Sequence, residues 1–282
     1  MAFRSDWHHA IRITPQSRLC HYRCLPSRTL ITNIQFEFDE DKVVDMPRVV
    51  SVVLVHGAWA DGSAWGKVIP ILKSHGLQVA AVQLTLASFD LDVAATNRII
   101  DAQDGQILLV GHSYGGAVIT EAGINPKVSG LAYVAARAPE AGESTMAKAE
   151  DYPTTEVFQE VRPIADGYLL LTETGVNEYF AQDLTPAEKD LLVSTQGQSN
   201  PEIFNTPLKA AAWTSKPSWF VVSANDKTIR PEEQKDTAKR LNAKTLILET
   251  SHVPMMSQPE KVAEFLVEAV KSLNEQTSNY CQ

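Results

Sequence analysis

Residues 106–116 of this 282-residue chain read QILLVGHSYGG, and this stretch carries the strongest signal for the fold. The apolar run QILLV is typical of a buried strand, and the residues from Gly115 onward have helical character. Between them, Ser113 stands in the pattern G-x-S-x-G, with Gly111 two residues before it and Gly115 two residues after it. This spacing predicts a sharp strand-to-helix turn that presents the Ser113 hydroxyl, because side chains at the two glycine positions would collide across the turn.

Strands and helices alternate on both sides of this turn. The run VVSVVLV at 49–55 is rich in β-branched residues, as expected of a strand covered on both faces. Helical patterns at 90–105 and 231–242 separate later apolar runs. The predicted strands cover 49–55, 77–84, 106–110, 127–136, 217–224 and 244–249. We therefore expect an α/β fold with a mostly parallel sheet flanked by helices.

The alternation stops after residue 137 and returns near residue 213. Residues 138–212 contain no strong strand pattern but several helix starts, including the capping box TPAE at 185–188 and a second Thr-Pro before a helical run at 206–213. We interpret 138–212 as a helical cap inserted into the core. The α/β core itself would then be built from residues 46–137 and 213–282.

The first 45 residues differ in composition from the rest. Residues 1–33 contain no lysine and one acid, Asp6, and their arginines are Arg4, Arg12, Arg18, Arg23 and Arg28. We favour a poorly ordered N-terminal extension over residues 1–45. The alternatives are an organelle transit peptide and a start codon assigned too early, since Met46 precedes the first strand. Cys20, His21 and Cys24 are too few ligands to predict a zinc site.

Composition limits the compartment and the partners of the chain. The formal net charge of −9 argues against nucleic acid and anionic membranes as partners. No apolar run approaches the length of a membrane-spanning helix. The three cysteines are odd in number and lie near the chain ends, which favours a reducing, cytoplasmic compartment, or an organelle if residues 1–33 are a transit peptide. The oligomeric state stays open between monomer and homodimer.

A serine hydroxyl needs a general base to act as a nucleophile. Of the seven histidines, His252 is the best candidate, because it lies in a short loop after the last predicted strand. Asp226 follows the strand at 217–224 directly and is the preferred acid, with Asp236 and Glu249 as rivals. In an open α/β sheet, ligands bind at the carboxyl ends of the strands. The chain order Ser113, Asp226, His252 also fits a nucleophile on such a turn.

An acyl-transfer site also needs hydrogen-bond donors for the oxyanion. One is expected to be the amide of Tyr114, and the other the amide of Ala58, in the loop after the first strand. A phosphate-binding loop is excluded there because Ser63 follows Gly62 where that motif requires lysine. No dinucleotide-binding glycine pattern follows any strand, and no metal or cofactor is expected.

Aromatic and histidine side chains near the predicted site are candidates for a substrate pocket. We single out Trp59, His112 and Trp213. Other aromatic candidates are Trp65, Phe158, Tyr179 and Phe204. For all the aromatic candidates, packing in the core is an equally good interpretation.

With these motifs assembled, the chain resembles the α/β-hydrolase superfamily over residues 46–274. The resemblance is carried by LVHGAW at 54–59, GHSYGG at 111–116, SANDKTIRPEEQ at 223–234 and SHVPMMSQPEKV at 251–262. It is strongest to small bacterial esterase-like members and extends to plant methyl-ester hydrolases and hydroxynitrile lyases. The resemblance implies a Ser113–His252–Asp226 triad and an oxyanion hole formed by Ala58 and Tyr114.

Two departures bear on the reaction. Hydroxynitrile lyases of this group have a lysine directly after the catalytic histidine, whereas this chain has Val253. Haloalkane dehalogenases and epoxide hydrolases have an aspartate where this chain has Ser113. We therefore expect a serine hydrolase that cleaves a small carboxylic ester through an acyl-enzyme. The alternatives are a slow-turnover ligand-binding or signalling homologue, and a lyase or perhydrolase on the same scaffold.

Overall fold

The computed structural model describes residues 48–279, and the side chains of residues 48–276. The expectations for residues 1–45 and for the Cys20–Cys24 cluster therefore lie outside the described residues. Within the described range, six strands form one sheet in the order β2-β1-β3-β4-β7-β8, and all neighbouring pairs are parallel. The bounds of these strands are β1 Val49–Val55, β2 Gln78–Ala81, β3 Gln106–His112, β4 Val128–Val134, β7 Ser218–Ser223 and β8 Lys244–Leu248. The predicted α/β fold is confirmed.

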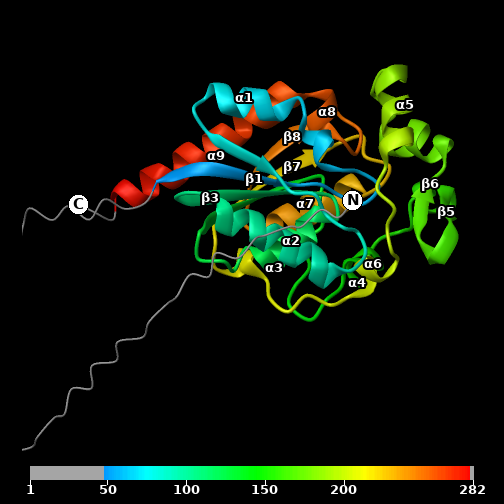
Figure 1. Cartoon of the computed structure of the whole chain (residues 1–282), viewed down its shortest axis with the longest axis horizontal. Helices are drawn as coiled ribbons and strands as arrows, with labels where there is room; N and C mark the ends of the chain where they lie inside the picture. Colours follow the sequence, from blue (N-terminus) through cyan, green and yellow to red (C-terminus); the bar gives the residue numbers. More distant parts are fainter. Residues whose placement is uncertain (1–47, 280–282) are drawn as a thin grey trace, which may run out of the picture. The chain divides into compact units, whose positions relative to one another are not determined.

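Helices cover both faces of this sheet (Figure 1). Helices α1 (Val68–Ser74) and α9 (Pro259–Asn279) lie together on one face, and α2 (Phe89–Ala102) and α3 (Gly115–Ala122) lie on the other. Helix α7 (Pro231–Arg240) packs against β7. The central strands are buried on both sides, which explains why their sequences are continuous apolar runs rather than alternating ones.

The segment between β4 and β7 lies beyond the carboxyl ends of the strands, on the right of Figure 1. It contains α4 (Thr145–Ala149), α5 (Pro186–Thr195), α6 (Glu202–Asn205) and several short 3₁₀ and π turns. It also contains an antiparallel pair, β5 (Val161–Pro163) with β6 (Leu169–Leu171). Helices alone were expected there. The sequence did not predict this pair because each strand has only three residues and shows no alternation of apolar and polar side chains.

A second difference concerns the helix expected at 206–213. Only a 3₁₀ turn forms there, Ala212–Thr214. The residues before this turn run in extended and bent backbone, and the amide of Lys209 is held by the side chain of Glu121 on α3, 2.6 Å away. A tertiary hydrogen bond thus competes with the local helix preference of the alanine run.

Candidate active site

Ser113 occupies the turn between β3 and α3, as the glycine pattern predicts. Its φ is +52°, a left-handed conformation that costs a non-glycine residue about 1–3 kcal/mol. A Cβ added to Gly111 would lie 2.5 Å from the carbonyl oxygen of Gly115, and one added to Gly115 would lie 2.5 Å from that of His56. Both glycines are therefore required by close backbone approach, and Ser113 is held at the sheet edge by its surroundings.

The three side chains predicted to work together form one hydrogen-bonded chain. The Ser113 hydroxyl lies 2.8 Å from His252 Nε2, and His252 Nδ1 lies 2.7 Å from Asp226 Oδ2. Both His252 and Asp226 are buried, whereas 9% of Ser113 is exposed. In this geometry the neutral ring donates from Nδ1 to the carboxylate and accepts the hydroxyl proton at Nε2. The rival acids Asp236 and Glu249 are excluded as partners of this ring. Both are exposed, and neither bonds to His252, whose Nδ1 is bonded to Asp226. Asp236 instead accepts from the Tyr152 hydroxyl.

Asp226 is fixed by three further donors. Its Oδ1 accepts from the amides of Thr228, at 2.7 Å, and Ile229, at 3.0 Å. Its Oδ2 accepts from Gln234 Nε2 at 2.7 Å, and Gln234 Oε1 accepts in turn from the Ser223 amide at 2.9 Å. Gln234 is fully buried on α7 and ties this helix, β7 and the carboxylate together. Sequence reasoning assigned Gln234 no role, although it is the last residue of the SANDKTIRPEEQ stretch at 223–234.

The loop after β1 approaches the Ser113 turn closely. A Cβ on Gly57 would lie 2.7 Å from the Ser113 Cβ, so only glycine fits there. The Trp59 amide donates to Ser199 Oγ at 3.4 Å. The amides of Ala58 and Tyr114, by contrast, donate to no group in the described part of the chain. Both predicted oxyanion donors are thus unused beside the serine.

His56 holds this loop in place, a role that the sequence did not indicate. Its Nδ1 donates to the Gly57 carbonyl at 2.8 Å, and its Nε2 accepts from the Leu84 amide at 3.0 Å. Burial lowers the pKa of His56, which keeps the ring neutral and able to accept at Nε2. The Tyr114 side chain is fixed on the other side, because its hydroxyl donates to the buried Asp92 at 3.0 Å. Burial, followed by the charge of Asp92, raises the pKa of Tyr114 well above its usual value, so the phenol stays protonated.

The structure corrects two of the three predicted pocket residues. Trp59 lines the pocket above Ser113, but His112 and Trp213 do not. His112 is fully buried behind the site, where its Nε2 donates to the His252 carbonyl at 2.8 Å. Burial and the neighbouring His252 keep the pKa of His112 well below its usual value. Trp213 donates from Nε1 to the Pro139 carbonyl at 3.2 Å and stacks on Arg240, so its ring is occupied elsewhere.

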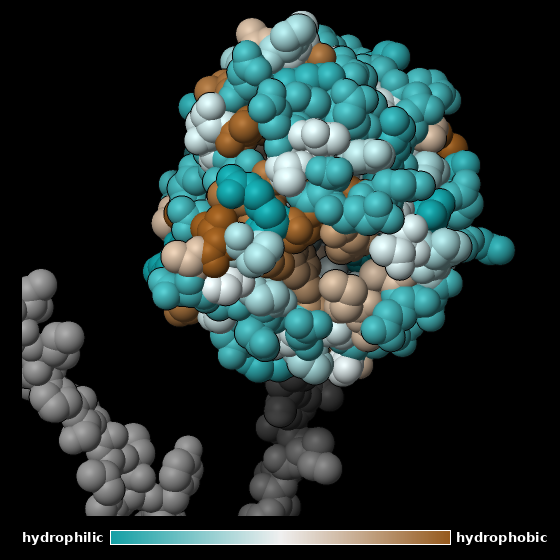
Figure 2. Space-filling model, turned by 90° about the vertical axis from the view of Figure 1, so that its right-hand side faces the viewer, coloured by the Kyte–Doolittle hydropathy of each residue, from teal (hydrophilic) through white to brown (hydrophobic). Residues whose placement is uncertain are grey.

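The pocket above Ser113 is narrow, with a volume of about 20 Å³. It is closed by side chains of the segment between β4 and β7, including Phe158 and Phe204. A second cavity of about 380 Å³ adjoins it. The two spaces share Arg137, Met146 and Phe158 in their walls. The face that carries this segment is largely hydrophilic, with apolar side chains gathered around one hollow (Figure 2).

Other kinds of site find no support in the described residues. No group of three or more histidine, cysteine or acidic side chains in the described part of the chain has a metal-binding arrangement. Across residues 48–279, no helix combines the length and apolarity needed to cross a bilayer.

Comparisons with known proteins point to one family. The sequence pattern of the Alpha/beta hydrolase family matches residues 52–265. A pyrethroid hydrolase of Sphingobium wenxiniae is 27% identical over 78% of this chain and 87% of its own length. Methylesterase 8 of Arabidopsis thaliana is 24% identical over 76% of this chain and 87% of its own length.

A solved structure agrees at the level of fold. The crystal structure of polyneuridine aldehyde esterase superposes with a TM-score of 0.70 at 20% identity, covering 79% of this chain and 99% of that one. Three observations agree: Ser113 stands on the turn after β3, the sheet has six parallel strands, and the family pattern matches residues 52–265. This chain is therefore a member of the alpha/beta hydrolase family.

Proposed function

We propose that this protein hydrolyses a small carboxylic ester with Ser113 as nucleophile. At the level of reaction class, the chain is a carboxylic ester hydrolase, in agreement with relatives named as pyrethroid hydrolase and methylesterases. The serine mechanism rests on one observation in particular. An unbroken chain of short hydrogen bonds runs from Asp226 through His252 to Ser113, at the floor of a pocket.

In the acylation half of the reaction, the Ser113 oxygen attacks the ester carbonyl carbon while its proton moves to His252 Nε2. Asp226 stabilises the imidazolium that forms. The negative charge that develops on the carbonyl oxygen is received by the amides of Ala58 and Tyr114, each worth about 3 kcal/mol in the transition state. His252 then gives its proton to the leaving alkoxide, which departs as the alcohol.

In the second half, a water molecule replaces the alcohol. His252 takes a proton from this water as its oxygen attacks the acyl carbon, and the same two amides hold the second oxyanion. The bond to Ser113 breaks, His252 returns the proton to the serine oxygen, and the carboxylic acid leaves. We propose that residues 138–212 act as the cap that selects the substrate, since they close the pocket above Ser113.

The proposal is tested by turnover of 4-nitrophenyl acetate. Ser113→Ala should abolish this activity to within the background of water hydrolysis while the thermal unfolding transition is kept. Ser194→Ala is a matched control, because Ser194 is an exposed serine on α5 that bonds only to its own helix. Turnover that persists at the wild-type rate in Ser113→Ala would overturn the proposal. Absence of turnover across a panel of esters and lactones, together with tight binding of one of them, would instead favour a binding protein.

A further inference from the structure

A buried ion pair stands where the narrow pocket above Ser113 meets the larger cavity. Arg137, three residues after β4, donates from Nε to Glu233 Oε1 at 2.5 Å and from Nη2 to Oε2 at 3.2 Å. The side chains are 10% and 3% exposed. Glu233 lies on α7, next to Gln234, which holds Asp226. Through Glu233, the pair is thus connected to the same helix that supports the proposed triad.

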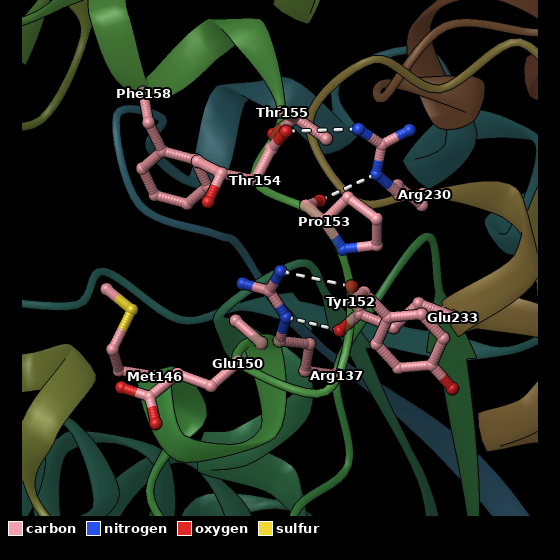
Figure 3. A pocket seen from close by; sticks show the side chains of 11 residues that line it. Arg137, Met146, Glu150, Tyr152, Pro153, Thr154, Thr155, Phe158, Arg230 and Glu233 are labelled. Carbon is pink, nitrogen blue, oxygen red and sulfur yellow. Dashed lines mark hydrogen bonds and ion pairs between the residues drawn. The ribbon is translucent and has the colours of Figure 1, made fainter.

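The third nitrogen of Arg137, Nη1, has no partner among the described residues. In the described part of the chain, Nε and Nη2 donate to Glu233, and Nη1 donates to no group. Figure 3 shows it on the side of the guanidinium away from Glu233, facing the space between Met146 and Phe158. Arg137, Met146 and Phe158 are the residues that line both spaces. A donor held by its ion pair with Glu233 therefore lies in the wall that the pocket above Ser113 shares with the cavity.

Two more polar atoms at the narrow pocket lack partners. Trp59 Nε1 and Thr145 Oγ1 are buried without a hydrogen bond to any described residue, and both side chains line the pocket above Ser113. Leaving a buried donor unsatisfied costs about 1–3 kcal/mol. Such atoms are expected where a ligand completes the hydrogen bonds.

The charge of the larger cavity is balanced. Its ionised wall residues are Arg137, Glu150, Arg230 and Glu233, two positive and two negative. A carboxylate on the substrate would compete with Glu233 for Arg137. The remaining surface includes Met146, Tyr152, Pro153 and Phe158, which offer an apolar lining.

We infer that the preferred substrate is an uncharged ester whose longer arm carries a hydrogen-bond acceptor, such as a ketone or ether oxygen, followed by an apolar group. Arg137 Nη1 donates to that oxygen, and the apolar group occupies the 380 Å³ cavity. The shorter arm stays in the narrow pocket at Ser113. This inference rests on the proposed ester hydrolysis and specifies its substrate class.

The experiment compares pairs of isosteric esters. One series consists of 4-nitrophenyl alkanoates in which a chain methylene is replaced by a ketone, one position at a time. A second series places the same ketones in the alcohol arm of acetate esters. At one position, the ketone ester should exceed its plain alkyl counterpart by about tenfold in kcat/KM, the effect of one hydrogen bond from a charged donor. An ester that ends in a carboxylate at that position should be poorer than both.

Variants locate the preference. In Arg137→Met/Glu233→Gln, the ratio of ketone to alkyl kcat/KM should fall to about one, and because the ratio is taken within one variant, general changes in rate cancel. Arg137→Lys keeps the charge but loses the planar set of guanidinium donors, so the ratio of ketone to alkyl kcat/KM should also fall most of the way to one. This variant replaces the double variant in the test if the double variant fails to fold. Arg162→Met, at an exposed arginine of β5, should keep the wild-type ratio.

The outcomes separate this inference from the proposed function. Turnover of 4-nitrophenyl acetate without any ketone preference in either series overturns the substrate class alone. A preference for the carboxylate ester overturns the requirement for an uncharged arm. A ketone preference that survives in Arg137→Met/Glu233→Gln overturns the role of Arg137. Failure to turn over any ester is a failure of the proposed function itself.

Discussion

Two neighbouring regions of this protein are built in opposite ways. At the carboxyl ends of β3, β7 and β8, Ser113, Asp226 and His252 are joined by short hydrogen bonds and held by backbone amides. The adjoining cavity under the segment between β4 and β7 is large, and one nitrogen of Arg137 in its wall has no hydrogen-bond partner among the described residues. In the function proposed above, the sheet edge carries out the reaction, whereas the inserted segment selects among substrates.

The largest expected effect is on kcat, and it distinguishes Asp226, the acid at the sheet edge, from the rival acid Glu249. Asp226→Asn keeps the size of the side chain but favours the wrong tautomer of His252, so kcat for 4-nitrophenyl acetate should fall about 10⁴-fold. Glu249→Gln, an exposed acid three residues before His252, should leave kcat within twofold of wild type. Steady-state kinetics at fixed pH measure both. Equal losses in the two variants would show that Asp226 has no special part.

The next effect concerns stability in the wall of the cavity. Arg137→Met leaves the Glu233 carboxylate buried without its partner, which should lower the free energy of unfolding by about 3–5 kcal/mol. Arg137→Met/Glu233→Leu removes both charges and should recover most of that loss. Urea denaturation measures the two values. A single variant as stable as wild type would mean that the carboxylate finds water or another donor, and that the cavity wall is not rigid.

The smallest effect tests the packing beneath the sheet edge through its pH dependence. Burial lowers the pKa of His112 well below 6.5, so the folded ring stays neutral while the unfolded ring binds a proton below about pH 6.5. Its contribution to stability is therefore present above pH 6.5 and is lost as the pH falls below it. Between pH 7.5 and 5.5 this one residue should cost about 1.4 kcal/mol of unfolding free energy.

His112→Gln keeps a donor for the His252 carbonyl and should reduce the loss between those two pH values by about that amount. His75→Gln, at the exposed ring that follows α1, is the control and should keep the wild-type loss. An identical pH dependence in His112→Gln and wild type would contradict a neutral buried ring at this position.

Local sequence patterns were enough to predict the sheet and the meeting of three side chains at its edge. The run at 49–55 matches β1 residue for residue, because a strand covered on both faces has an unmistakable apolar pattern. The placement of Ser113 followed from the glycines on either side of it. His252 and Asp226 followed from their positions directly after strands, since the carboxyl ends of parallel strands lie on one edge.

The supporting contacts were out of reach because they join residues whose sequence neighbourhoods carry no matching signal. Arg137 and Glu233 are 96 residues apart, and Arg137 lies in no recognised motif. Glu233 lies in the SANDKTIRPEEQ stretch at 223–234, but nothing in that stretch indicates an arginine partner. The sequence gives no reason to separate Gln234 from the other polar residues of an amphipathic helix, although Gln234 is fully buried. Trp213 was chosen for its aromatic character alone, and nothing in the sequence reveals that Arg240 and Pro139 occupy its ring.

The nucleophile can be identified by finding the residue that a fluorophosphonate probe modifies in the intact protein. We predict one adduct per chain, on the peptide that contains Ser113, formed rapidly in wild type. His252→Gln should slow the labelling by several orders of magnitude, since the hydroxyl loses its general base. If the enzyme hydrolyses esters, an adduct on a different residue would contradict Ser113 as the nucleophile. Unchanged labelling of Ser113 in His252→Gln would contradict His252 as its general base.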